Sequence, residues 1–243
     1  MLKTKQGLMY YEVDTKDSDI LCFTTTRIGG FGIDFFDFGD NTNKELSEKN
    51  YALLCSVFNL PGMPEKVIQT HSANVLDLDK YYEKSRYAYD GMITSAVNVP
   101  LGILTADCYS VQIIGENLIS NLHCGWRSVY SGIIENTLRL FQMKGEKTLK
   151  AVVGVGICSN CYEVSEDLAE KFESKFGFPD IAERKNGKFY LNLRKIIEKN
   201  LKRLGVSEII HLQNCTFCNK YLYSFRRDRE NAGRMITIIM RKG

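Results

Sequence analysis

The chain has 243 residues, of which 44% are hydrophobic and 25% are charged, a balance typical of a globular protein with its own core. This composition excludes a disordered or collagen-like chain, and the formal net charge of +3 is too small to indicate nucleic-acid binding. The sequence contains no apolar run of about 18 residues, and its start lacks the apolar segment of a secretory signal. We therefore expect a cytoplasmic protein with neither a membrane nor a nucleic-acid partner.

Strands and helices alternate in the first half of the predicted pattern. In chain order we predict a strand at 21–27, a loop at 29–32, a helix at 44–58, one or two strands at 66–79, and strands at 101–115 and 117–125. The helix is expected to end before Leu60-Pro61-Gly62, because these residues break helical structure.

Amphipathic helices dominate the second half. In chain order we predict a helix around 130–141, a strand at 150–158, helices at 165–177 and 193–204, and strands at 208–213 and 234–242. Ser165 can cap the second of these helices and Gly177 can close it. Without a linker or a strict βαβ repeat, we expect one domain over residues 1–243 with an α+β fold of mixed sheets.

Three segments at predicted strands carry the reactive residues. They contain His71, Cys108 and His123, and the chain has only three histidines. Two imidazoles and a thiolate, with a fourth position left for water, form the ligand pattern of a catalytic zinc site. The same donors suit copper. From spacing alone, an equally good interpretation is that Cys108 and His123 are buried core residues.

The remaining cysteines include two Cys-x-x-Cys pairs, Cys158 with Cys161 and Cys215 with Cys218. Such pairs together can hold a structural zinc ion. Because the pairs are far apart in sequence and lack a glycine-rich knuckle, we favour core or loop thiols for at least two of the four. A long chain rich in apolar residues does not need disulfides, so we expect reduced thiols.

Several arginines stand beside these segments. Guanidinium groups bind phosphate and carboxylate in bidentate fashion, so Arg27 and Arg127 are candidates for an anion pocket, together with Arg226. For Arg227 we favour an ordinary surface ion pair.

The order of these segments resembles the YfiH-type family, also called the laccase-domain or polyphenol-oxidase family and described as purine nucleoside phosphorylases. The matching motifs span nearly the whole chain: TTRIGG (25–30), QTHS (69–72), TADCYS (105–110), HCGWRS (123–128), CYEV (161–164), CT (215–216), SFRRD (224–228) and GRM (233–235). The resemblance implies an α+β fold like the catalytic domain of cytotoxic necrotizing factor, with mixed sheets packed together and helices outside. Segment 31–41 departs from the family pattern, which leaves the substrate preference open.

The resemblance also implies a function and a set of roles. We expect a zinc-dependent enzyme that cleaves adenosine and inosine with phosphate, deaminates adenosine and, as in some members, acts on methylthioadenosine. Its partners would be the nucleoside and phosphate, and the protein would be a monomer or homodimer. The implied zinc ligands are His71, Cys108 and His123. Asp107 or Asp90 would carry protons, and the implied substrate-binding residues are Arg27, Gln69, Arg127 and Arg226.

Three alternatives remain. A zinc or cysteine hydrolase acting on cell-wall precursors would use Cys108 as nucleophile or ligand and His123 as base or ligand. A copper-dependent phenol oxidase would need more histidines than the chain has, although copper competes well for such donors. A non-enzymatic interaction module would carry a closed site with four ligands.

Overall fold

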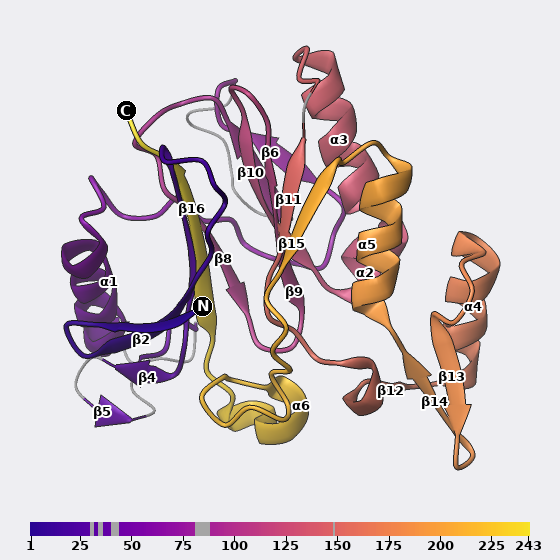
Figure 1. Cartoon of the computed structure of the whole chain (residues 1–243). Coiled ribbons are helices and arrows are strands. Elements are labelled where there is room, and N and C mark those ends of the chain that lie inside the picture. Colours follow the sequence, from indigo (N-terminus) through magenta and orange to yellow (C-terminus); the bar gives the residue numbers. More distant parts are fainter. Residues whose placement is uncertain (30–31, 34–35, 40–43, 81–87, 148) are drawn as a thin grey trace.

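Two β-sheets lie against each other in the middle of the molecule, and helices cover their outer faces (Figure 1). The computed structural model describes residues 1–29, 32–33, 36–39, 44–80, 88–147 and 149–243. Segment 31–41, the predicted departure from the family pattern, and the loop predicted at 29–32 lie partly outside these residues.

The first sheet has five strands and is antiparallel throughout. Its strands are, in spatial order, β1 (Leu2–Lys5), β2 (Leu8–Glu12), β3 (Ile20–Thr25), β16 (Met235–Arg241) and β8 (Leu101–Thr105). The second sheet has six strands, in the order β15 (Glu208–His211), β11 (Lys150–Val153), β9 (Tyr109–Ile114), β10 (Ile119–Cys124), β7 (Gly91–Thr94) and β6 (Val75–Asp77). It is mixed, because β15 pairs with β11 in parallel and β6 with β7 in parallel.

Alternation along the strands explains how the sheets pack, since successive side chains point to opposite faces. Buried Cys22 and Ile239 of the first sheet pack in one cluster with Met92 and Val152 of the second. On β9, Val111 and Ile113 face the other way, towards the helices. Burial of these apolar faces, at about 25 cal/mol per Å² of apolar surface, stabilises the sandwich.

Helices complete the outer layers. α1 (Lys44–Phe58) packs on the five-stranded sheet, where the rings of Phe58 and Phe23 stack with centroids 3.8 Å apart. The helices packed on the six-stranded sheet are α2 (Trp126–Ser131), α3 (Ile133–Met143) and α5 (Leu193–Arg203).

Smaller elements join the layers. α4 (Glu166–Phe176) packs on a three-stranded sheet of β12 (Glu163–Val164), β14 (Lys188–Leu191) and β13 (Ala182–Lys185). The others are the two-stranded sheet of β4 (Ile28–Gly29) and β5 (Gly32–Ile33), the 3₁₀ turns η1 (Ser159–Cys161) and η2 (Arg229–Asn231), and the short helix α6 (Phe225–Asp228).

The predicted α+β class, with mixed sheets packed together and helices outside, is confirmed. The helix at 44–58 is confirmed at both ends. α4 is confirmed with its caps: the Ser165 side chain accepts from the backbone N–H of Leu168, and Gly177 adopts the left-handed conformation. These are local signals, and local hydrogen bonding suffices to form them.

Three predicted elements were wrong in extent. The strand predicted at 101–115 is two strands, β8 and β9, which lie in different sheets. The helix around 130–141 is broken at Gly132, where φ is 95°. Of the strands predicted at 66–79, the structure forms only β6. In the described part of the chain, no helix is long and apolar enough to cross a membrane.

Candidate metal centre and active site

The turn between β8 and β9 carries the chain from one sheet to the other and presents Cys108. Thr105 still pairs with β16, and Tyr109 already pairs with β10. Asp107 between them has a φ of 99°, a region that non-glycine residues rarely adopt and that cannot continue a strand. The sharp reversal places the half-buried Cys108 at the ends of β8 and β10.

His123 reaches the same place from β10. It shares the face of Ile119 and Asn121, which points towards the five-stranded sheet, and it is 4% exposed. Its Nδ1–H donates to Asp90 Oδ1 at 2.7 Å. This bond fixes the ring orientation and leaves Nε2 as the nitrogen available to a ligand.

Asp90 is fully buried and organises the loop that carries the third residue. Its carboxylate accepts backbone N–H groups of Thr70 at 3.1 Å, His71 at 2.9 Å and Ser72 at 2.6 Å, and the Ser72 hydroxyl at 2.9 Å. These bonds hold His71 in a left-handed conformation, with φ of 61°. One buried carboxylate therefore positions both histidines.

The three candidate ligands converge. One donor atom from each of His71, Cys108 and His123 lies within 4.8 Å of the others, and Cys108 Sγ is 3.9 Å from His71 Nε2. Gly125 permits this approach, because a Cβ there would lie 2.8 Å from His71 Cδ2 and 3.0 Å from Cys108 Sγ. Two imidazoles and one thiolate fit zinc, and copper accepts the same donors.

Electrostatics within the centre favour the charged forms. Burial raises the pKa of the Cys108 thiol, but His123 and His71 outweigh it and lower that pKa to about 6. Burial lowers the pKa of His123, yet Cys108 and Asp90 raise it to about 9. For Asp90, burial raises the pKa, but the hydrogen bonds from His123 and Ser72 bring it below the usual value. A thiolate is the form of cysteine that binds metals and attacks carbon.

Asp107 and Gln69 both bond to the protein itself. Asp107 accepts the Thr216 hydroxyl and the Arg226 backbone N–H, each at 2.6 Å, so it ties the Cys108 turn to the start of α6. The Gln69 side chain bonds the backbone of Leu104 through both its amide nitrogen and its oxygen, at 2.8 and 2.9 Å. These contacts hold the end of β8 and the turn at Asp107, which lead directly into Cys108.

Of the candidate arginines, Arg226 belongs to α6 and Arg27 pairs with Asp228 of the same helix. Arg27 lies 3.7 Å from Asp228 and over the Tyr223 ring, near α6. Arg226 donates to the Glu163 carbonyl at 3.0 Å and lies over the ring of Tyr162.

Arg127 is exposed and lies over the ring of Trp126, 4.3 Å from its centroid. Burial raises the pKa of Tyr162, and the charges that act on it include Cys108, Arg226 and Arg127. Both arginines therefore lie within electrostatic reach of one tyrosine beside the centre.

Two residues of the site were missed by sequence reasoning. Gly125 lies in HCGWRS (123–128) and Tyr162 in CYEV (161–164), but the small size of glycine and the aromatic ring of tyrosine do not by themselves indicate a functional role. The sequence favours core or loop thiols for at least two of Cys158, Cys161, Cys215 and Cys218, and the structure adds that all four sulfur atoms lie within 4.8 Å of one another. The repeated spacing was the available signal.

The fold and the donor set define a candidate metal centre at one end of a two-sheet sandwich. A family model described as "Multi-copper polyphenol oxidoreductase laccase" matches residues 21–242. Relatives named "Purine nucleoside phosphorylase YfiH" are known from Escherichia coli and Shigella flexneri. The chain belongs to this YfiH-type laccase-domain family, as the sequence motifs predicted.

Relatives across the family carry two kinds of name. A purine nucleoside phosphorylase from Haemophilus influenzae is 34% identical over 235 residues, which cover 91% of this chain and 94% of that protein. Adenosine deaminase RL5, from an unknown prokaryotic organism, is 28% identical over 192 residues, covering 72% and 73%. The crystal structure of YlmD from Geobacillus stearothermophilus has the same fold, with a TM-score of 0.85 at 21% identity over 99% of this chain and 98% of that one.

Proposed function

We propose that the protein is a zinc-dependent purine nucleoside enzyme that cleaves adenosine and inosine with phosphate and also deaminates adenosine. The observation that carries this proposal is the convergence of His71, Cys108 and His123 on one point. It supports an enzyme of the kind named among the relatives, which include purine nucleoside phosphorylases and an adenosine deaminase. A cytoplasmic location suits this proposal, because reducing conditions keep thiolate ligands available.

The three converging residues would hold the zinc ion. His123 would offer Nε2, because its Nδ1–H is committed to Asp90, and Cys108 would offer its thiolate. Bound zinc supplies Lewis-acid chemistry and acidifies water that reaches it, which suits deamination. The group comprises three donors among the described residues, which leaves a fourth position open, as in a catalytic zinc site and unlike a closed structural site of four ligands.

Arg127 and Arg226 are the residues we assign to phosphate. Cleavage of the glycosidic bond develops charge at the ribose and the attacking oxygen, and fixed cations near these atoms stabilise the transition state. Arg127 supports this assignment because it is exposed and lies in the first turn of α2, directly after β10, which carries His123. Asp107 acts as a positioning residue in this scheme, since its Oδ1 accepts the Thr216 hydroxyl and its Oδ2 accepts the Arg226 backbone N–H.

Product analysis by mass spectrometry tests the proposal. Purified protein is incubated with adenosine, with and without phosphate, beside Cys108→Ala and the matched control Cys55→Ala, in which the changed thiol lies near Gly62 and not at the centre. We expect adenine and ribose 1-phosphate only with phosphate, inosine in either buffer, and loss of all products in Cys108→Ala alone. A zinc-loaded protein that forms none of these products refutes the proposal.

A matched pair of arginine variants tests the phosphate assignment. Arg127→Ala is expected to raise the KM for phosphate at least about tenfold, because a charge-assisted hydrogen bond contributes about 1.5–3 kcal/mol. Arg184→Ala is the control, since Arg184 is also exposed and lies over an aromatic ring, that of Phe189 on β14. An unchanged KM in Arg127→Ala contradicts the assignment.

One observation favours a second candidate, a cysteine hydrolase acting on cell-wall precursors. Cys108, His123 and Asp90 follow one another in the order thiolate, imidazole, carboxylate, which is the arrangement of an activated nucleophile. In that case metal-free protein hydrolyses a muropeptide amide, and alkylation of Cys108 abolishes the reaction. Activity that depends on zinc content instead assigns Cys108 as a ligand.

A further inference from the structure

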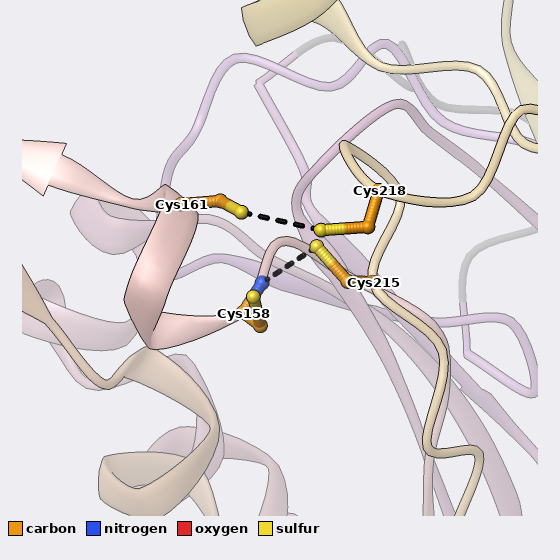
Figure 2. Close-up of side chains that lie close together, drawn as sticks. All are labelled: Cys158, Cys161, Cys215 and Cys218. Carbon is orange, nitrogen blue, oxygen red and sulfur yellow. Dashed lines mark hydrogen bonds between the residues drawn. The ribbon is translucent and has the colours of Figure 1, made fainter.

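Four cysteines outside the His71–Cys108–His123 centre meet beyond the ends of β11 and β15 (Figure 2). Cys158 and Cys161 come from the segment around η1, and Cys215 and Cys218 come from a turn after β15. All four sulfur atoms lie within 4.8 Å of one another. Figure 2 shows the side chains of the two segments pointing towards a common centre.

Backbone pairing brings the two segments together. β11 and β15 run parallel, and beyond the strand ends an isolated parallel bridge pairs Gly156 with Cys215, shifted by one residue from the register of the strands. The Thr216 N–H donates to the Gly156 carbonyl at 3.2 Å, and the Gly156 N–H donates to Asn214 at 3.4 Å. The position of each pair is therefore set by the sheet and not by the cysteines.

Each pair then folds into one tight turn. The Cys158 carbonyl accepts the Cys161 N–H at 3.0 Å, and the Cys215 carbonyl accepts the Asn219 N–H at 2.9 Å. In such a turn the first and fourth side chains lie on the same side, so each Cys-x-x-Cys presents two sulfurs. The Cys158 N–H also donates to Cys215 Sγ at 3.3 Å, a contact that stabilises a thiolate.

Neither a disulfide nor core packing accounts for this cluster. The closest sulfurs that the structure pairs, those of Cys161 and Cys218, are 3.4 Å apart, whereas a disulfide bond is about 2.05 Å long. None of the four cysteines belongs to the hydrophobic clusters of the described residues, and Cys218 is exposed. Four thiols at this separation have the arrangement of a ligand set.

We propose that Cys158, Cys161, Cys215 and Cys218 bind one zinc ion in a tetrahedral structural site, separate from the His71–Cys108–His123 centre. Zn–S bonds of about 2.3 Å place tetrahedral sulfurs about 3.8 Å apart, which agrees with a cluster whose sulfurs all lie within 4.8 Å. Thiolates are soft ligands, and a set of four favours zinc over magnesium, calcium and manganese, which prefer oxygen ligands. The thiol protons pass to solvent as the metal binds.

This zinc would also hold the turn that carries Cys108. Ile157, which precedes Cys158, donates its N–H to the Asp107 carbonyl at 2.9 Å. Thr216, which follows Cys215, donates its hydroxyl to the Asp107 carboxylate. A zinc ion that joins the two Cys-x-x-Cys turns would therefore stabilise both contacts to Asp107, one through Ile157 and one through Thr216.

Metal analysis of paired variants tests the proposal. Zinc and iron per chain are measured by plasma mass spectrometry for the wild type, the double variant C161S/C218S, Cys108→Ser and the matched control Cys55→Ser. We expect C161S/C218S to lose about one zinc ion per chain while Cys55→Ser loses none. The zinc that remains in Cys108→Ser should show four sulfur neighbours at about 2.3 Å by X-ray absorption.

These readouts do not depend on enzyme activity, so the four-cysteine site and the proposed function can fail separately. Equal zinc content in the wild type and C161S/C218S overturns the proposal, as does iron in place of zinc. If C161S/C218S does not fold, Cys108→Ser, which lacks the thiol of the His71–Cys108–His123 centre, is titrated with a mercurial reagent while an indicator follows zinc release. Release of zinc in step with four slowly reacting thiols supports the site, and four thiols that react freely without releasing zinc overturn it.

Discussion

Replacing Asp90 with asparagine tests how the buried carboxylate holds the metal centre. Asp90 accepts five hydrogen bonds, and asparagine has only one acceptor oxygen. In the less costly orientation, its NH₂ group replaces the oxygen that bonds the His71 N–H and His123 Nδ1–H, so two bonds are lost. Each bond to a charged acceptor contributes about 1.5–3 kcal/mol, so the free energy of unfolding should fall by at least about 3 kcal/mol.

For a chain of this size, this loss corresponds to a fall in Tm of at least about 6 °C. Without an acceptor for Nδ1–H, the orientation and tautomer of the His123 ring are no longer fixed, so zinc affinity should fall about 10–100-fold. Thermal unfolding and zinc titration against a competing chelator measure the two effects. The control is Asp180→Asn, whose side chain is 85% exposed. If Asp90→Asn matches the wild type in both Tm and zinc affinity, the reasoning is refuted.

Three further substitutions probe the surroundings of the centre. Gly125→Ala should weaken zinc affinity at least about tenfold, because the added Cβ would collide with His71 and Cys108. The control Gly62→Ala should leave zinc affinity unchanged, because a Cβ there meets nothing within 4 Å. Equal affinities of the two variants in chelator competition would contradict the prediction. Gln69→Ala removes both hydrogen bonds to β8 and should lower the free energy of unfolding by about 1–3 kcal/mol. A raised KM with unchanged stability would instead assign Gln69 to the substrate. Burial raises the pKa of Asp79, but Lys144 and neighbouring hydroxyl and N–H donors lower it to about 2. The ionised Asp79 carboxylate therefore stabilises the folded state above its unfolded pKa of about 3.9, and this stabilisation is lost as the pH falls through about 2. Denaturant unfolding at several pH values should show that Asp79→Asn destabilises the protein at neutral pH and that this difference shrinks as the pH falls.

Local signals predicted the elements that depend on neighbouring residues. α1 and α4 are at the predicted positions because their caps, breaks and apolar faces lie within a few residues of each other. The three histidines and the cysteines identified the candidate ligands for a similar reason: their side-chain chemistry is visible without knowledge of the fold. Motif order added the family, which the comparison confirmed.

The switch between sheets at Asp107 was beyond sequence reasoning. Ala106 and Asp107 are poor strand formers, but the residues on either side favour strands and no Gly or Pro marks the turn that ends β8 and starts β9. The positive φ of Asp107 is maintained by Thr216 and Arg226, which are distant in sequence. Asp90 was expected only as a proton carrier, and its role in positioning both histidines follows from the five hydrogen bonds that it accepts.

The sequence by itself determined the candidate ligands, the ends of α1 and α4, and the family, because each depends on residue type and short spacing. Tertiary structure alone decided which donors meet. The pairing of β11 with β15 and the bridge from Gly156 to Cys215 bring the two Cys-x-x-Cys turns together, although their separation in sequence argued against it. This pairing depends on long-range hydrogen bonds and on the burial of whole strand faces, which residue type and short spacing do not show, and it places the four sulfur atoms in one cluster.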